Sequence, residues 1–158
     1  HLHLSDRHVQ IQSGDTRIIA RLIEGQWPDW RQVIPGEVAA WLRVEKDALI
    51  GALHRVSLMC KDDLTAVDFR VDPDTKHDLI ITAALAQVGE AREELSVFLD
   101  GDNWNIDVAI RPKYLREALS VIDGDEVQIG YCGPKRPVML RDESDEGWTY
   151  VVMPVMKQ

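Results

Sequence analysis

Hydrophobic residues recur with two different periods along this chain, and the change of period separates strands from helices. Over residues 1–23, apolar and polar positions alternate, so that Leu2 and Leu4 share one face, which predicts three consecutive antiparallel strands. Over residues 46–59, apolar residues recur every three to four positions, which predicts an amphipathic helix. The chain is therefore expected to mix strands and helices.

A unit of one strand, one helix and three strands occurs twice in the rest of the chain, at an offset of about 65 residues. The elements expected for the first copy are the strand 40–44, the helix 46–59 and the strands 65–71, 78–85 and 91–99. Those expected for the second copy are the strand 104–110, the helix 111–122 and the strands 126–131, 137–141 and 148–153. Turn-forming residues at 72–74 and 100–103 separate neighbouring strands.

The first strands of the chain match the last three strands of this unit. The sequence therefore predicts an α+β fold with antiparallel sheets. Residues 1–27 are expected to be the end of one domain, residues 28–35 a connector, and residues 36–158 a complete second domain of the same kind. The chain begins at His1 within a strand-like pattern and without Met, as expected for a fragment of a longer protein.

The connector region has an unusual composition. Pro28 and Pro35 each fix φ and remove a backbone donor, which favours an extended segment over a helix. Trp27 and Trp30 add more apolar surface than a solvated linker carries. Two interpretations follow: the segment packs on its own domains, or it also forms a wall of a partner-binding groove.

The net charge of −9 argues against nucleic acid at face value, because phosphate binding depends on Lys and Arg. The stretches 46–61 and 111–122, however, hold six basic residues against two acidic ones. This distribution is typical either of ordinary solvated helix faces or of basic helices turned towards DNA in an acidic protein. Two separate cysteines, Cys60 and Cys132, favour a reducing cytoplasm, and no apolar run is long enough to span a bilayer.

Three weaker patterns suggest other chemistry. His1, His3 and His8 resemble a metal-binding group, but a solvent-facing strand edge explains them more simply. Ser57 and His54 lack a nucleophile elbow, so a hydrolase site is not expected. The acidic run 142–146 has the chemistry to bind Mg²⁺, although a solvated turn is the simpler interpretation. We therefore expect no enzyme activity, no metal and no cofactor.

Five segments in order carry a family resemblance: residues 24–35, 48–58 and 89–95, then Pro112-Lys113-Tyr114-Leu115 and Tyr150-Val151-Val152-Met153-Pro154. With them the chain resembles the bacterial DNA polymerase III beta subunit, the sliding clamp, over essentially its whole length. The resemblance implies the DNA-clamp fold and a homodimeric ring of three similar domains per subunit. It also implies a processivity factor that encircles duplex DNA without reading its sequence. The partners implied are the polymerase III catalytic subunit, the clamp loader and other clamp-motif proteins.

The resemblance also assigns roles to residues. The peptide groove would be lined by Pro28, Val33, Tyr114, Val151, Met153 and Pro154. The DNA-facing residues would be Lys46, Arg55, Lys113 and Arg116, and the dimer interface would include Leu58 and Met59. Gln32, Arg111 and Met156 depart from the family pattern at the groove rim.

From the residues alone, simpler interpretations stay open. Val151 and Met153 are also compatible with positions facing the interior, and Leu58 and Met59 with an ordinary core. For the chain as a whole, a clamp-like interaction module that does not encircle DNA is the alternative to a ring component.

Overall fold

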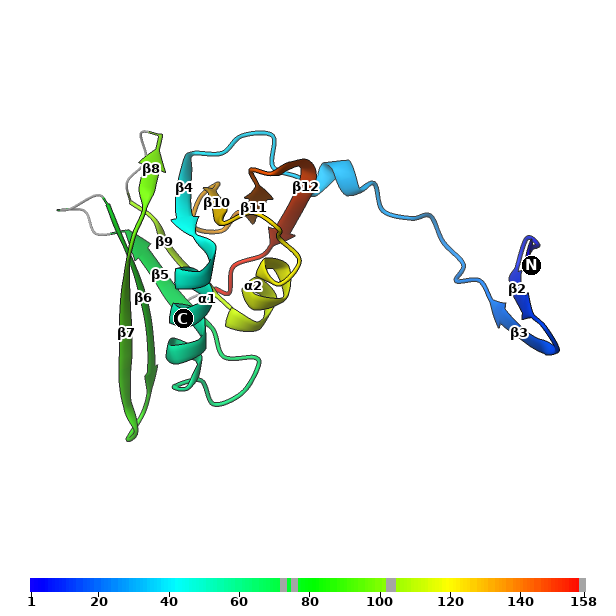
Figure 1. The fold of residues 1–158 in the computed structure, drawn as a ribbon, viewed down its shortest axis with the longest axis horizontal. Coiled ribbons are helices and arrows are strands. Elements are labelled where there is room, and N and C mark those ends of the chain that lie inside the picture. Colours follow the sequence, from blue (N-terminus) through cyan, green and yellow to red (C-terminus); the bar gives the residue numbers. More distant parts are fainter. Residues whose placement is uncertain (72–73, 75–76, 102–104, 157–158) are drawn as a thin grey trace. The chain divides into compact units, whose positions relative to one another are not determined.

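The computed structural model describes residues 1–71, 74, 77–101 and 105–156. The chain folds as two compact units, 1–31 and 32–158, and each is described here by itself (Figure 1). Parts of the turns expected at 72–74 and 100–103, and Trp104 of an expected strand, lie outside the described residues.

The first unit is a three-stranded antiparallel sheet in the order β1-β2-β3. Its strands are β1 (Leu2–Leu4), β2 (His8–Ser13) and β3 (Thr16–Arg21). Gly14 has a φ of 56° in the two-residue turn between β2 and β3, a conformation that glycine adopts without strain. The three predicted strands are thus present, although the third ends at Arg21 and not at Ile23.

The connector is not extended throughout. Trp30–Gln32 form one turn of 3₁₀-helix (η1), and the Asp29 carboxylate accepts a hydrogen bond from the Arg31 backbone N–H at its start. The expectation of an entirely non-helical connector was therefore wrong at this turn. Prolines fix φ at 28 and 35 but leave the residues between them free to form a short turn.

The second unit contains both copies of the repeated pattern. The first copy consists of β4 (Ala40–Glu45), α1 (Lys46–Ser57), β5 (Val67–Val71), β6 (Asp78–Leu85), β7 (Gly89–Ser96) and β8 (Phe98–Asp100). The second copy consists of β9 (Asp107–Ile110), α2 (Pro112–Leu119), β10 (Glu126–Tyr131), β11 (Val138–Asp142) and β12 (Asp145–Val152).

The two copies exchange strands to make two sheets. One sheet has the order β12-β11-β10-β4-β8 and the other β7-β6-β5-β9, with antiparallel pairing throughout. Each sheet therefore holds three consecutive strands of one copy and the first strand of the other copy, and the five-stranded sheet also holds β8, the last strand of the first copy. This exchange joins the two copies into one domain, and it confirms the predicted α+β class with antiparallel sheets and two helices.

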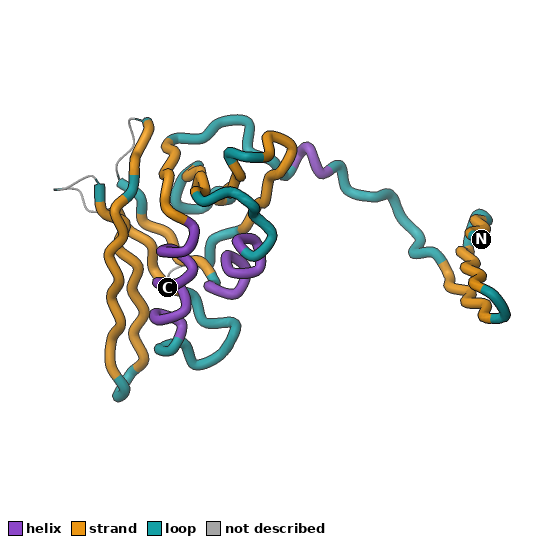
Figure 2. The backbone as a smooth tube through the Cα atoms, viewed as in Figure 1, coloured by secondary structure: helices purple, strands orange, loops and turns teal. Residues whose placement is uncertain are grey.

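The helices lie beside each other in this unit and bury apolar residues (Figure 2). Leu49, Leu53 and Val56 of α1 are fully buried, and Leu115 of α2 is only 1% exposed. The Glu45 carboxylate caps α1 by accepting hydrogen bonds from the first-turn backbone N–H groups, and Pro112 starts α2, where no backbone donor is required. The helix predicted over 111–122 is shorter than expected and ends at Leu119.

One predicted strand is in fact two. The segment expected as a single strand over 91–99 is divided at Val97 into β7, in the four-stranded sheet, and β8, in the five-stranded sheet. Val97 is buried and its backbone N–H donates to the His77 carbonyl at 2.6 Å. Local alternation of apolar residues cannot reveal such a change of sheet, because both strands have the same period.

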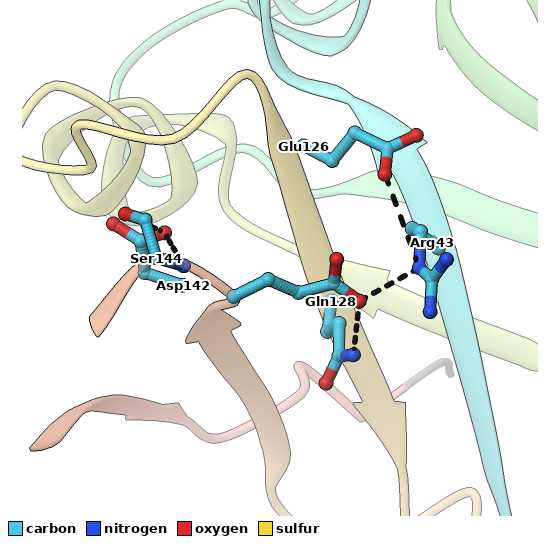
Figure 3. A network of polar contacts seen from close by, with 6 residues as sticks. Arg43, Glu126, Gln128, Asp142 and Ser144 are labelled. Carbon is cyan, nitrogen blue, oxygen red and sulfur yellow. Dashed lines mark hydrogen bonds and ion pairs between the residues drawn. The ribbon is translucent and has the colours of Figure 1, made fainter. Parts of the chain in front are cut away.

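The start of the acidic run is buried. Asp142 is 5% exposed, and its carboxylate accepts hydrogen bonds from the backbone N–H groups of Asp123 and Gly124. It also accepts from the backbone N–H and the hydroxyl of Ser144 (Figure 3). These bonds hold the pKa of Asp142 below its usual range. The expectation of a fully solvated acidic turn was wrong here, because this carboxylate ties the segment after α2 to the β11–β12 turn.

Candidate DNA- and partner-binding surfaces

The basic residues of the helices are largely paired. The Arg55 guanidinium makes two hydrogen bonds of 2.8 Å to the Glu93 carboxylate of β7. The pairing raises the pKa of Arg55 and lowers that of Glu93, in both cases chiefly through the side-chain hydrogen bond. The positive charge of Arg55 on α1 is therefore largely neutralised by Glu93.

The second helix shows a similar arrangement. Lys113 Nζ lies 2.9 Å from the Asp63 carboxylate, which raises the pKa of the ammonium group. Lys46 Nζ donates to the Ile122 carbonyl at 3.1 Å, so it links the start of α1 to the segment after α2. Arg116 is exposed and has no ion pair among the described residues. Of the four predicted DNA-facing residues, it is therefore the one whose positive charge is least neutralised.

A pocket of about 150 Å³ lies between the end of α1 and the start of α2. Its lining residues are Ser57, Cys60, Asp62, Asp63, Pro112, Lys113 and Arg116. Hydrogen bonds from the Thr65 hydroxyl and the Leu64 backbone lower the pKa of Asp62, and burial raises the pKa of the Cys60 thiol. Acidic groups therefore border the basic ones in this pocket.

The predicted groove residues of the second unit lie on its surface. Val152 is buried, so strand alternation points its neighbour Val151 to the opposite face. Met153 and Val33 are 60% and 53% exposed, and Pro154 is half-buried. The interpretation that Val151 and Met153 face the core is therefore wrong. Pro28 is exposed and belongs to the first unit.

Tyr114 differs from the other groove residues because it packs against the core. The Arg111 guanidinium lies 5.9 Å from the centre of its ring and donates to its hydroxyl at 3.4 Å. Arg111 also donates to the Leu64 carbonyl at 3.1 Å, so it fixes the start of α2 against the loop that follows α1. Tyr114 is consequently held in place and presents only part of its ring.

The two predicted interface residues have different environments. Leu58, the C-cap of α1, is 66% exposed, whereas Met59 is half-buried and packs on the core. Leu64, which the sequence did not single out, is also 66% exposed. The core interpretation thus applies to Met59 and not to Leu58.

Sequence reasoning missed the acidic partners Glu93 and Asp63. Each lies far along the chain from its basic partner, by 38 and 50 residues. One feature of the sequence did point to a partner for Glu93. Strand alternation along β7 puts Glu93 on the same face as Ala91 and Leu95, which pack against the core. A carboxylate on that face requires a partner.

The family model for the DNA polymerase III beta subunit, C-terminal domain, matches residues 31–156. The chain belongs to this family. The beta sliding clamp of Caulobacter vibrioides (strain NA1000 / CB15N) is 27% identical over 154 residues, which are 98% of this chain and 40% of that protein. The beta sliding clamp of Staphylococcus epidermidis is 24% identical over 155 residues, again 40% of its length.

Solved structures agree with this membership. A crystal structure of the C. crescentus beta sliding clamp superposes with a TM-score of 0.85 at 26% identity, and covers 99% of this chain and 41% of that one. The Thermotoga maritima beta subunit superposes with a TM-score of 0.83 at 21% identity, over 99% and 41% of the two chains. The DNA-clamp fold predicted from the sequence is thereby confirmed. The chain spans about two fifths of the length of these family members.

No helix among the described residues has the length and hydropathy that crossing a membrane would require. No three His, Cys, Asp or Glu side chains within that part of the chain gather closely enough to hold a metal ion.

Proposed function

We propose that this chain is the C-terminal part of a sliding clamp, a non-catalytic ring that encircles duplex DNA and tethers the replicative polymerase. The observation that carries the proposal is the family match over residues 31–156, together with the clamp fold of the second unit. Residues 1–27 would be the last strands of the preceding domain, 28–35 the connector and 36–158 the C-terminal domain. The partners would be duplex DNA, the polymerase III catalytic subunit, the clamp loader and a second copy of the subunit.

The helices would face the DNA. Arg116 supplies a free charge, whereas Arg55 and Lys113 are restrained by carboxylates, so attraction to phosphate would be weak and independent of sequence. A ring does not require tight binding, because it is held on DNA by its closed shape. Weak contacts allow it to slide.

Glu93→Gln is expected to release Arg55 for phosphate contact in the full-length subunit. The slope of log K against log salt concentration should then become steeper by about 0.9, the contribution of one further phosphate contact. Glu24→Gln is the matched control, because Glu24 pairs with Arg21 outside the helices and β7, and its loss changes net charge equally. Equal slopes for the two variants would show that Arg55 does not face DNA.

The groove would take short clamp-motif peptides on Val33, Tyr114, Val151, Met153 and Pro154 of the second unit. Exposed methionine is suited to this role because its flexible, polarisable side chain adapts to related peptides. The C. crescentus clamp was solved with polyethylene glycol bound at its proposed beta-motif tethering region. The rim of the groove would differ from the family pattern at Gln32, Arg111 and Met156, whereas the apolar floor would be kept.

Met153→Ala is expected to weaken binding of a clamp-motif peptide to the full-length subunit about thirtyfold, which corresponds to the roughly 2 kcal/mol of an interface hot spot. Val121→Ala is the control, because Val121 is similarly exposed at 63% and lies outside the proposed groove. Fluorescence anisotropy of a labelled peptide measures both.

The 158-residue chain alone should bind the same peptide more weakly than the full-length subunit, and equal affinity would contradict the groove as proposed.

The dimer interface would use the end of α1 and the free edge of β7. β7 is an outer strand of its sheet, so one row of its backbone groups is unpaired and available to another strand. Leu58 supplies exposed apolar area at the end of the helix that packs on β7. Glu90 and Glu94 are exposed on β7, so a basic strand of the second subunit would complement it.

A further inference from the structure

A second pocket lies on the face of the five-stranded sheet that is turned away from the main core. It has a volume of about 250 Å³ and is lined by Trp41, Arg43, Phe98, Asp100, Gln128 and Arg141. These residues come from β4, β8, β10 and β11, so the pocket is built on paired strands and not on loops. None of them belongs to the groove or the helices described above.

Two arginine–aromatic pairs shape this pocket. The Arg141 guanidinium lies 4.7 Å from the centre of the Trp41 ring, and the Arg43 guanidinium 5.7 Å from that of Phe98. The Trp41 ring crosses Gly130 of β10, where a Cβ atom would lie 2.8 Å from the ring. Only glycine leaves this space, so Gly130 allows the indole to lie flat on the sheet.

Polar contacts hold one side of the pocket in place. Arg43 Nε lies 2.7 Å from a Glu143 carboxylate oxygen, and the Gln128 side-chain amide donates to the same oxygen at 2.6 Å (Figure 3). Glu126 lies 4.0 Å from Arg43 Nε. Arg43 is thus committed to acidic neighbours of its own chain.

Arg141 is different. It is exposed, it stacks on Trp41, and among the described residues no carboxylate lies within 4 Å of it. A guanidinium held flat by an aromatic ring keeps its N–H donors directed outwards and binds a carboxylate through two parallel hydrogen bonds. Phe98, three strands away in the order β11-β10-β4-β8, is 62% exposed and offers apolar area at the other end of the pocket. The pocket therefore presents a positive group at one end and an apolar group at the other.

We propose that this pocket, named here the Trp41–Arg141 pocket, binds an extended peptide segment that carries one carboxylate side chain and, four residues away, an aromatic or aliphatic one. The carboxylate would pair with Arg141 and the apolar side chain would contact Phe98. An extended peptide fits because side chains four residues apart are separated by about 13 Å, close to the roughly 14 Å between β11 and β8, which are three strand spacings apart. Single-stranded nucleic acid fits less well, because Asp100, Glu126 and Glu143 border the site and the guanidinium covers the indole face.

The test is fluorescence anisotropy with the 158-residue chain and a labelled, acetylated peptide Phe-Ser-Thr-Ser-Glu-amide, which carries one carboxylate four residues from its aromatic side chain. Arg141→Gln should weaken binding about tenfold, because it removes a charge-assisted hydrogen-bonding pair. Arg136→Gln is the matched control, an exposed arginine outside the pocket, and should leave binding unchanged. Arg141→Lys should recover only part of the loss, because an ammonium group lacks the planar fork.

Phe98→Ala provides a second, independent variant at an exposed position and should also weaken binding. Equal effects of Arg141→Gln and Arg136→Gln would overturn the proposal, as would tighter binding of a labelled oligo-dT than of the peptide. Met153→Ala should not alter this binding, since Met153 does not line the pocket. Failure of this proposal would therefore leave the groove proposal standing, and the reverse also holds.

Discussion

Replacement of Leu53 by alanine is expected to lower the free energy of unfolding of this chain by about 2–5 kcal/mol. Leu53 is fully buried on α1, where it packs into the core between the helices and the sheets. The truncation removes apolar contacts and leaves a cavity that the two flanking sheets cannot close. Chemical denaturation monitored by circular dichroism measures the difference in the second unit.

Leu58→Ala is the matched control for this prediction. The residue type and the helix are the same, but Leu58 is 66% exposed, so the change in the free energy of unfolding should stay within about 0.5 kcal/mol. In the full-length subunit the same variant should weaken dimerisation, because Leu58 is proposed to face the second subunit. A loss of stability at Leu58 as large as that at Leu53 would contradict the surface position of this residue.

Asp142→Asn is expected to lower the midpoint of thermal unfolding by on the order of 5 °C. The carboxylate accepts hydrogen bonds from three backbone N–H groups and the Ser144 hydroxyl. The asparagine amide has an N–H₂ group in place of one carboxylate oxygen. The hydrogen-bond donors that face this oxygen in the native protein would therefore lose their acceptor. Asp145→Asn is the control, since Asp145 accepts one hydrogen bond, from the Gly147 backbone, at an exposed position.

The effect of Asp142 should also depend on pH. Its pKa is lowered in the folded state, so its contribution is present above the unfolded-state pKa of about 3.9 and is lost as the pH falls through the lower folded-state value. The difference in stability between the native chain and Asp142→Asn should therefore be constant near neutral pH and shrink below pH values of about 4. A difference that grows on acidification would show that the carboxylate is not ionised in the folded protein.

Much of the fold was predictable because the pattern of apolar residues is strong in both copies of the repeated unit. Leu49, Leu53 and Val56 have the helical spacing, and all three are fully buried. The exchange of β4 and β9 between the copies was not predictable, because strand alternation specifies which face is buried but not which strand is the neighbour. The change of sheet at Val97 escaped prediction for the same reason.

The candidate sites were predictable only in part. The family resemblance assigned Met153 and Arg116 to exposed sites, and the structure has both side chains on the surface. The sequence could not indicate that Glu93 neutralises Arg55, because the two residues meet only after β7 packs beside α1. Ion pairs between distant segments are properties of the tertiary structure, so charge counts along a helix overestimate the net charge of the helix surface.

Retention of the full-length subunit on DNA tests the central claim most directly. After loading by the clamp loader, the subunit should stay on a nicked circular plasmid through gel filtration and should be lost when a restriction enzyme linearises that plasmid. The account predicts this difference because a ring is held by its closure and not by affinity. Equal retention on circular and linear DNA, or retention on neither, would contradict a ring that encircles the duplex.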